Sequence, residues 1–214
     1  MFQKLLQLLG IGNTGSAPSS VTPPAPLRPI RKPRLPQCSP RVSKILAWPD
    51  PLEAPENGVD EAARIATLHA AYNTPAHEVR PRLLLGSLKA VTPDFIAARR
   101  VTHVLNCLPA TEAAGVPGVE TLSLDLEDEP GQVLPLQDAV AFIERALAAP
   151  GSVVLVHCAM GVSRSVACVC AFIMRSERCA VETALRSVRV ARPQALPNEG
   201  FLEQLVSFEK TLAA

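Results

Sequence analysis

Residues 152–174 read SVVLVHCAMGVSRSVACVCAFIM and join a strand, a loop and a helix in one short stretch. The first part, SVVLVH, is a continuous run rich in β-branched residues, which is typical of a central strand covered on both faces. The last part, residues 163–174, is apolar on every side, which predicts a helix buried through the middle of the domain. The loop between them follows the carboxyl end of a buried strand, where open α/β sheets bind their ligands.

The flanking sequence alternates between strand and helix patterns. Three further strands are predicted at residues 82–87, 101–107 and 119–125. Apolar spacing and capping residues predict helices at 60–72, 92–100, 136–147, 180–191 and 198–213. Strands that alternate with helices indicate a single α/β domain with a central, mainly parallel sheet flanked by helices.

Composition narrows the function classes. The chain has 214 residues, of which 48% are apolar, and a formal net charge of +1. This net charge gives no overall electrostatic attraction to nucleic acid or to a membrane surface. Its longest apolar run is far short of the about 20 residues that a spanning helix needs. The six cysteines have irregular spacing, which predicts neither a zinc site nor a secreted disulfide framework, and favours a reducing compartment. We therefore expect no metal and no cofactor.

The N-terminal quarter has a different composition. Eleven of the 21 prolines lie within residues 1–55, and no acidic residue precedes Asp50. Such a segment cannot bury enough apolar surface to offset its ordering entropy, which predicts a disordered, basic, proline-rich arm before a globular domain at 56–214. The run RPIRKPRLP at 28–36 is a weak signal for partner docking.

The first ten residues form a separate pattern, because Phe2, Leu5, Leu6 and Leu9 share one helical face. A chance periodicity, an organelle-targeting segment and a docking helix all remain open readings. We expect the protein in the cytoplasm, with the nucleus and organelle targeting as alternatives.

The chemistry concentrates in the loop of residues 158–164, called the cradle loop below. A tight turn there presents backbone N–H groups to an anion, and the following helix adds its positive end. Gly161 supplies backbone freedom, and Arg164 can hold two phosphate oxygens with its planar fork. Donors that bind phosphate also stabilise a thiolate, which makes Cys158 a nucleophile that needs no adjacent base. By contrast, Cys168, Cys170 and Cys179 lack such surroundings and are interpreted as inert thiols.

The stretch HCAMGVSRS at 157–165 resembles the H-C-x-x-G-x-S-R-S loop of dual-specificity protein phosphatases, which are cysteine-dependent enzymes. HEVRPRLLLGSLKAV at 77–91, VTHVLNC at 101–107 and RVARPQALPNEGFLEQL at 189–205 resemble other segments of that family. The resemblance covers about residues 76–213. It implies the cysteine-phosphatase fold and hydrolysis of phosphotyrosine and phosphoserine or phosphothreonine through a cysteinyl-phosphate intermediate.

The resemblance also implies residue roles. Cys158 is the nucleophile, Ser165 donates its hydroxyl to it, His157 orients the loop, and Asn198 braces it, although Asn198 also fits a plain helix cap. The phosphate-binding set is Ala159, Met160, Gly161, Val162, Ser163 and Arg164. His69, His77 and His103 have no evident partners in the sequence and are interpreted as structural.

Expelling the alcohol or phenol requires a general acid on a separate loop. The segment LSLDLEDEPGQVLP at 122–135 offers Asp125 and Asp128. Asp125 directly ends the predicted strand, as the acid does in the family, so we favour Asp125 and keep Asp128 as the alternative. Glu127 and Glu129 are interpreted as solvated loop charges.

Substrate class follows from the loop side chains, because Ala159, Met160 and Val162 carry no charge. Relatives that act on inositol phospholipids tend to carry lysine there, so we expect a phosphoprotein substrate with a single phosphate. Two alternatives remain, namely a phosphatase for a non-protein substrate such as an RNA 5′ end or a phospholipid, and a non-catalytic phospho-binding module.

Overall fold

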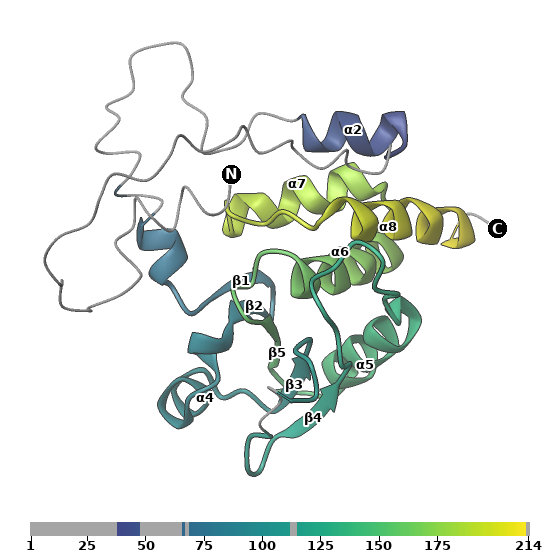
Figure 1. The fold of residues 1–214 in the computed structure, drawn as a ribbon. Coiled ribbons are helices and arrows are strands. Elements are labelled where there is room, and N and C mark those ends of the chain that lie inside the picture. The colour runs from purple at the N-terminus through teal and green to yellow at the C-terminus, as the bar shows by residue number, and fades with distance from the viewer. Residues whose placement is uncertain (1–37, 48–65, 67–68, 112–114, 213–214) are drawn as a thin grey trace, which may run out of the picture. The chain divides into compact units, whose positions relative to one another are not determined.

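A computed structural model describes residues 38–47, 66, 69–111 and 115–212. Within this part a five-stranded sheet has the order β1-β2-β5-β3-β4 (Figure 1). The four neighbouring strands β2, β5, β3 and β4 run parallel, and only the edge strand β1 is antiparallel. The predicted α/β class with a mainly parallel sheet is therefore confirmed.

The central strand β5 (Val154–Cys158) is buried along its whole length, as its continuous apolar run predicts. It pairs with β2 (Leu83–Ser87) on one side and with β3 (His103–Asn106) on the other. The edges are β4 (Glu120–Ser123) and β1 (Ala76–Arg80). The sequence analysis did not separate β1 from the strand that follows it.

Helices cover both faces of the sheet. α4 (Pro93–Arg99) closes the smaller core on one face, and α5 (Leu136–Ala148) and α6 (Arg164–Glu177) cover the other. Outside α6 lie α7 (Val181–Ala191) and α8 (Glu199–Leu212) (Figure 1). Every residue of α6 up to Met174 is buried, which confirms the prediction of a central helix.

The helix expected at residues 60–72 is described only in part. Residue 66 and residues 69–73 are helical, and the rest of the predicted span lies outside the described residues.

A further helix, α2 (Pro40–Leu46), lies inside the segment that was expected to be a disordered arm. Val42 and Ile45 are 0% and 1% exposed and join the main core against α8. The amide and hydroxyl of Ser39 both donate to the carboxylate of Glu203.

Charge pairing adds to this docking, since Arg41 binds Glu182 at 2.6 Å and Glu209 at 2.8 Å. The prediction of disorder over 1–55 is therefore wrong for residues 38–47, because two apolar side chains and one arginine find partners on distant helices. The rest of the arm, including the apolar stripe of residues 2–9 and the basic run at 28–36, lies outside the described residues.

Candidate active site

The cradle loop begins where β5 ends. Cys158 is the last residue of the strand and is 1% exposed. The backbone N–H of Gly161 and the hydroxyl of Ser165 both donate to its Sγ, each at 3.2 Å. Two donors on one sulfur stabilise the negative charge of a thiolate, which is the nucleophilic form of cysteine. Thus the arrangement holds the sulfur ready for attack on an electrophile.

Gly161 is required by the shape of the loop. Its φ is +66°, in the left-handed region that favours glycine. A Cβ at this position would overlap the carbonyl of Gly86 and lie 2.6 Å from the Nη2 atom of Arg192. Both the backbone conformation and the space therefore exclude a larger residue.

The sequence analysis missed Arg192, which lies behind the loop and is 0% exposed. Its Nε donates to the carbonyl of Gly161 at 2.7 Å, and its Nη2 donates to the carbonyl of Met160 at 2.9 Å. Binding these two carbonyls from behind fixes the peptide planes of the loop, which leaves the adjacent N–H groups on the opposite side. The only signal in the sequence was the arginine of the R-P pair at 192–193.

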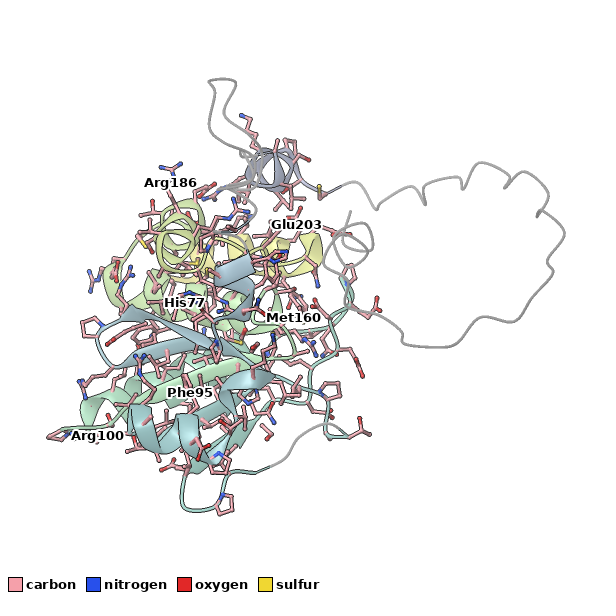
Figure 2. All side chains as sticks on the ribbon, turned by 90° about the vertical axis from the view of Figure 1, so that its left-hand side faces the viewer. His77, Phe95, Arg100, Met160, Arg186 and Glu203 are labelled. Atoms are coloured by element: carbon pink, nitrogen blue, oxygen red, sulfur yellow. The ribbon has the colours of Figure 1, made fainter. Side chains whose placement is uncertain are left out.

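His77 completes this arrangement on β1. Its Nδ1 lies 2.9 Å from the Nη1 of Arg192. Both His77 and Met160, whose carbonyl Arg192 also binds, are labelled in Figure 2. Burial and the nearby positive charge of Arg192 lower the pKa of His77 below its usual 6.5. A neutral ring is therefore the form that faces Arg192, and His77 has a partner that the sequence did not reveal.

Arg164 opens α6 and is 8% exposed. Its Nη1 donates to the carbonyl of Leu126 at 3.0 Å, which anchors one arm of the guanidinium. Its Nε is buried, makes no hydrogen bond to any described residue, and lies 3.8 Å from the Oδ2 of Asp128. An anchored guanidinium with an unused donor fits the binding of an oxyanion.

The structure separates the two candidate acids. The Oδ1 of Asp128 accepts from the Ser163 hydroxyl at 2.6 Å and from the Asn198 Nδ2 at 3.0 Å, so this carboxylate lies on the cradle loop. Asp125 is exposed, and its Oδ1 accepts from the backbone N–H of Ala110 at 2.6 Å. The structure thus brings Asp128, and not the favoured Asp125, to the cradle loop.

The acid loop, residues 124–135, is held in place by α8. Gly200 allows this approach, because a Cβ there would overlap the carbonyl of Pro130. Gln204 accepts from the N–H of Leu134 and donates to the carbonyl of Gln132, each at 2.8 Å. The position of the acid loop therefore depends on the amino-terminal half of a helix far along the chain.

Asn198 makes hydrogen bonds both to the start of α8 and to the residues around the cradle loop. Its Oδ1 accepts from the N–H of Phe201 at 3.0 Å, which caps α8, while its Nδ2 contacts Asp128. Its own N–H donates to the Ser163 hydroxyl at 3.2 Å. His157 is 1% exposed, and burial lowers its pKa to about 4, so the ring is neutral near pH 7.

The remaining loop residues present no charge. Ala159 and Val162 are partly exposed, Met160 is 40% exposed, and Ser163 is buried. Of the other thiols, Cys168 and Cys170 are buried, and burial raises the pKa of Cys170. Within the described residues no group of three His, Cys, Asp or Glu side chains could hold a metal ion, and no helix is long and apolar enough to cross a membrane.

Comparisons with known proteins place this geometry in a family. The family model for the dual specificity phosphatase catalytic domain matches residues 83–211. Rat dual specificity protein phosphatase 12 is 44% identical over 63% of this chain and 41% of its own length. Bovine dual specificity protein phosphatase 26 is 34% identical over 80% of this chain and 85% of its own length.

The crystal structure of human DUSP28 superposes with a TM-score of 0.61, at 35% identity over 65% of this chain and 96% of that one. This chain spans less than half the length of rat dual specificity protein phosphatase 12, so the similarity concerns the shared domain. Since the family model covers more than half of the sequence, the chain belongs to the family of dual specificity phosphatase catalytic domains.

Proposed function

We propose that this protein is a dual-specificity protein phosphatase that hydrolyses phosphotyrosine and phosphoserine or phosphothreonine. The observation that carries the proposal is the convergence on one loop of a cysteine sulfur with two donors, an anchored arginine and a carboxylate. A nucleophile, an anion site and a proton source are the three components that hydrolysis through a cysteinyl phosphate uses.

The reaction proceeds in two steps. In the first, the Cys158 thiolate attacks phosphorus, the P–O bond to the substrate breaks, and Asp128 gives its proton to the leaving oxygen. In the second, a water gives a proton to Asp128 and attacks the cysteinyl phosphate, which releases phosphate and restores the thiolate. The Ser165 hydroxyl, 3.2 Å from the sulfur, stabilises the thiolate as it leaves. Arg164 and the loop N–H groups bind the phosphoryl oxygens throughout.

Asp128 takes the role of acid in this scheme in place of Asp125. Its contacts with Ser163 and Asn198 support the assignment, because they keep the carboxyl beside the phosphate site. Asp125 is instead bound to the Ala110 amide. In this proposal its position directly after the strand therefore carries less weight than these contacts.

The test compares two variants on two leaving groups. Removing a general acid costs typically about 10²–10⁴ in rate, and the loss shrinks when the leaving group needs no proton. Asp128→Ala should therefore lose about that much kcat on phenyl phosphate and far less on an activated aryl phosphate with a low-pKa leaving group. Asp125→Ala is the matched control and should lose little on either. A loss at Asp125 that depends on the leaving group would reverse the assignment.

The phosphoprotein substrate rests on the uncharged side chains of Ala159, Met160 and Val162. The alternatives are an RNA 5′ end, a phospholipid, and a binding module without turnover. An enzyme should hydrolyse an aryl phosphate and lose this activity in Cys158→Ser, whereas a binding module should show no hydrolysis. Comparison of phosphopeptides with phosphoinositides and triphosphorylated RNA distinguishes the substrates.

A further inference from the structure

We propose that three exposed apolar side chains, Leu88, Met160 and Leu196, select a singly phosphorylated site whose neighbouring peptide residues are apolar. They are called the apolar rim. The inference rests on the proposed function and adds a sequence preference to it. It starts from where the exposed apolar side chains of this molecule lie.

Large apolar side chains are exposed at few places in the described residues. Seven reach 36% exposure or more, and they are Leu46, Leu88, Val133, Met160, Val190, Leu196 and Leu212. Three of the seven belong to the cradle loop or to segments bonded directly to it. We base the inference on these three, because they lie on segments that meet at one loop, whereas single exposed apolar residues elsewhere need no explanation.

Hydrogen bonds fix the rim to the loop from two sides. Leu88, in the short helix η1 (Leu88–Ala90), donates its N–H to the Ala159 carbonyl at 3.1 Å. Leu196, between α7 and α8, donates its N–H to the Val162 carbonyl at 2.8 Å. Met160 lies in the loop itself, and its side chain is exposed (Figure 2). These bonds hold the backbones of Leu88 and Leu196 against the cradle loop, so in this proposal the groups next to a bound phosphate lie beside the three side chains.

The charges near the loop argue against a substrate with several phosphates. In the segments 87–91 and 192–198 the only cations are Lys89 and Arg192. Lys89 donates its Nζ to the Oδ1 of Asn73, and Arg192 is buried behind the loop. On these segments a second phosphate would find a single exposed cation, Lys89, and a substrate with several phosphates needs more such partners.

Carboxylates on the acid loop strengthen this argument. The exposed acidic residues of that loop are Asp125, Glu127, Asp128 and Glu129. A polyphosphorylated headgroup or an RNA end would be repelled by the carboxylates of Asp125, Glu127 and Glu129, while Asp128 carries the proton that it gives to the leaving group. A peptide with apolar side chains next to its phosphorylated residue carries one phosphate only and covers the apolar rim. The chemistry of the site thus fits a peptide better than a phosphoinositide or an RNA.

The experiment uses the full chain and a pair of phosphotyrosine peptides that differ only in the two residues flanking the phosphorylated one. One peptide carries leucine at both positions, and the other carries serine. Covering part of one or two leucines is worth roughly a fivefold to tenfold preference in kcat/KM for the leucine peptide. Leu88→Ser and Leu196→Ser should each reduce this ratio about two- to threefold.

Leu212→Ser is the matched control. Leu212 is 36% exposed, close to the 40% of Leu196, and it lies at the far end of α8 from Asn198. Its ratio should equal that of the unaltered chain. All three replaced leucines are exposed, so the unfolding midpoints of the variants should agree and exclude a folding effect.

Three outcomes are separated by this design. A leucine preference that falls only in the two rim variants supports the inference. Equal kcat/KM on both peptides, or a ratio that neither rim variant changes, overturns it and leaves the phosphoprotein function standing. Faster turnover of a polyphosphorylated phosphoinositide or a triphosphorylated RNA than of either peptide overturns the inference together with the proposed phosphoprotein function.

Discussion

Replacing Arg192 by methionine removes three hydrogen bonds from behind the cradle loop. The lost donors reach the carbonyls of Gly161 and Met160 and the Nδ1 of His77, at 2.7, 2.9 and 2.9 Å. The methionine fills most of the volume but offers no donor. Two loop carbonyls then face a buried site without a partner, and a buried acceptor left in this way costs about 1–3 kcal/mol.

The expected loss of stability follows from the number of carbonyls that lose their partner. Two unsatisfied carbonyls cost about 2–6 kcal/mol in the free energy of unfolding. Part is recovered because the variant no longer buries a cation, a cost that is also visible in the pKa of Arg192, which burial lowers to about 10. We expect a net loss of roughly 2–4 kcal/mol in the free energy of unfolding, measured by urea denaturation.

The same variant should also lose activity when it is assayed in its folded state, at urea concentrations well below its unfolding midpoint. Free rotation of the peptide planes misplaces the N–H groups that bind phosphate, and a misplacement of about 1 Å costs roughly 10²-fold in rate. Weaker inhibition by vanadate should accompany the loss of kcat/KM, because vanadate binds to the same N–H groups.

Two further variants complete this test. Arg192→Lys keeps the charge without the planar fork and should be intermediate in both readouts. Arg186→Met replaces an exposed arginine of α7, the helix that ends just before Arg192, and should change stability by less than about 0.5 kcal/mol. If Arg192→Met retained the vanadate affinity and kcat/KM of the unaltered chain, the loop would not depend on Arg192 and the reasoning would be refuted.

Three other outcomes are expected. EDTA should leave turnover intact while vanadate and Cys158→Ser abolish it, and a requirement for added magnesium or zinc would contradict the cysteine mechanism. In the folded protein the pKa of His157 is lowered to about 4 from 6.5, so its contribution to stability is complete above pH 6.5 and is lost as the pH falls toward 4. The urea midpoint of unfolding should therefore decline between pH 6.5 and pH 4. His157→Gln should reduce the dependence of this midpoint on pH. Ile45→Ala should cost about 2–5 kcal/mol in the free energy of unfolding, because Ile45 is buried where α2 docks. Leu46→Ala, at 38% exposure, should cost less than about 0.5 kcal/mol, and equal costs would mean that α2 does not dock on α8.

The sequence by itself determined the elements whose signal is local. A short apolar run rich in β-branched residues is typical of a covered strand, and a helix that is apolar on all sides is typical of a domain interior. The elements β5 and α6 and the loop between them therefore followed from residues 152–174. The functional candidates Cys158 and Arg164 came with them, because their spacing lies within one strand–loop–helix unit. Here neighbours in the sequence are also neighbours in space.

Only the tertiary structure decided which distant residues support that unit. Arg192 lies 31 positions from Gly161, Asp128 lies 35 positions from Ser163, and Ser39 lies 164 positions from Glu203. Each of these contacts depends on the relative placement of two elements. That placement is fixed by the packing of the whole core and leaves no periodic or local trace in the chain. For this reason the strand end favoured Asp125, whereas the tertiary structure brings Asp128 to Ser163 and Asn198.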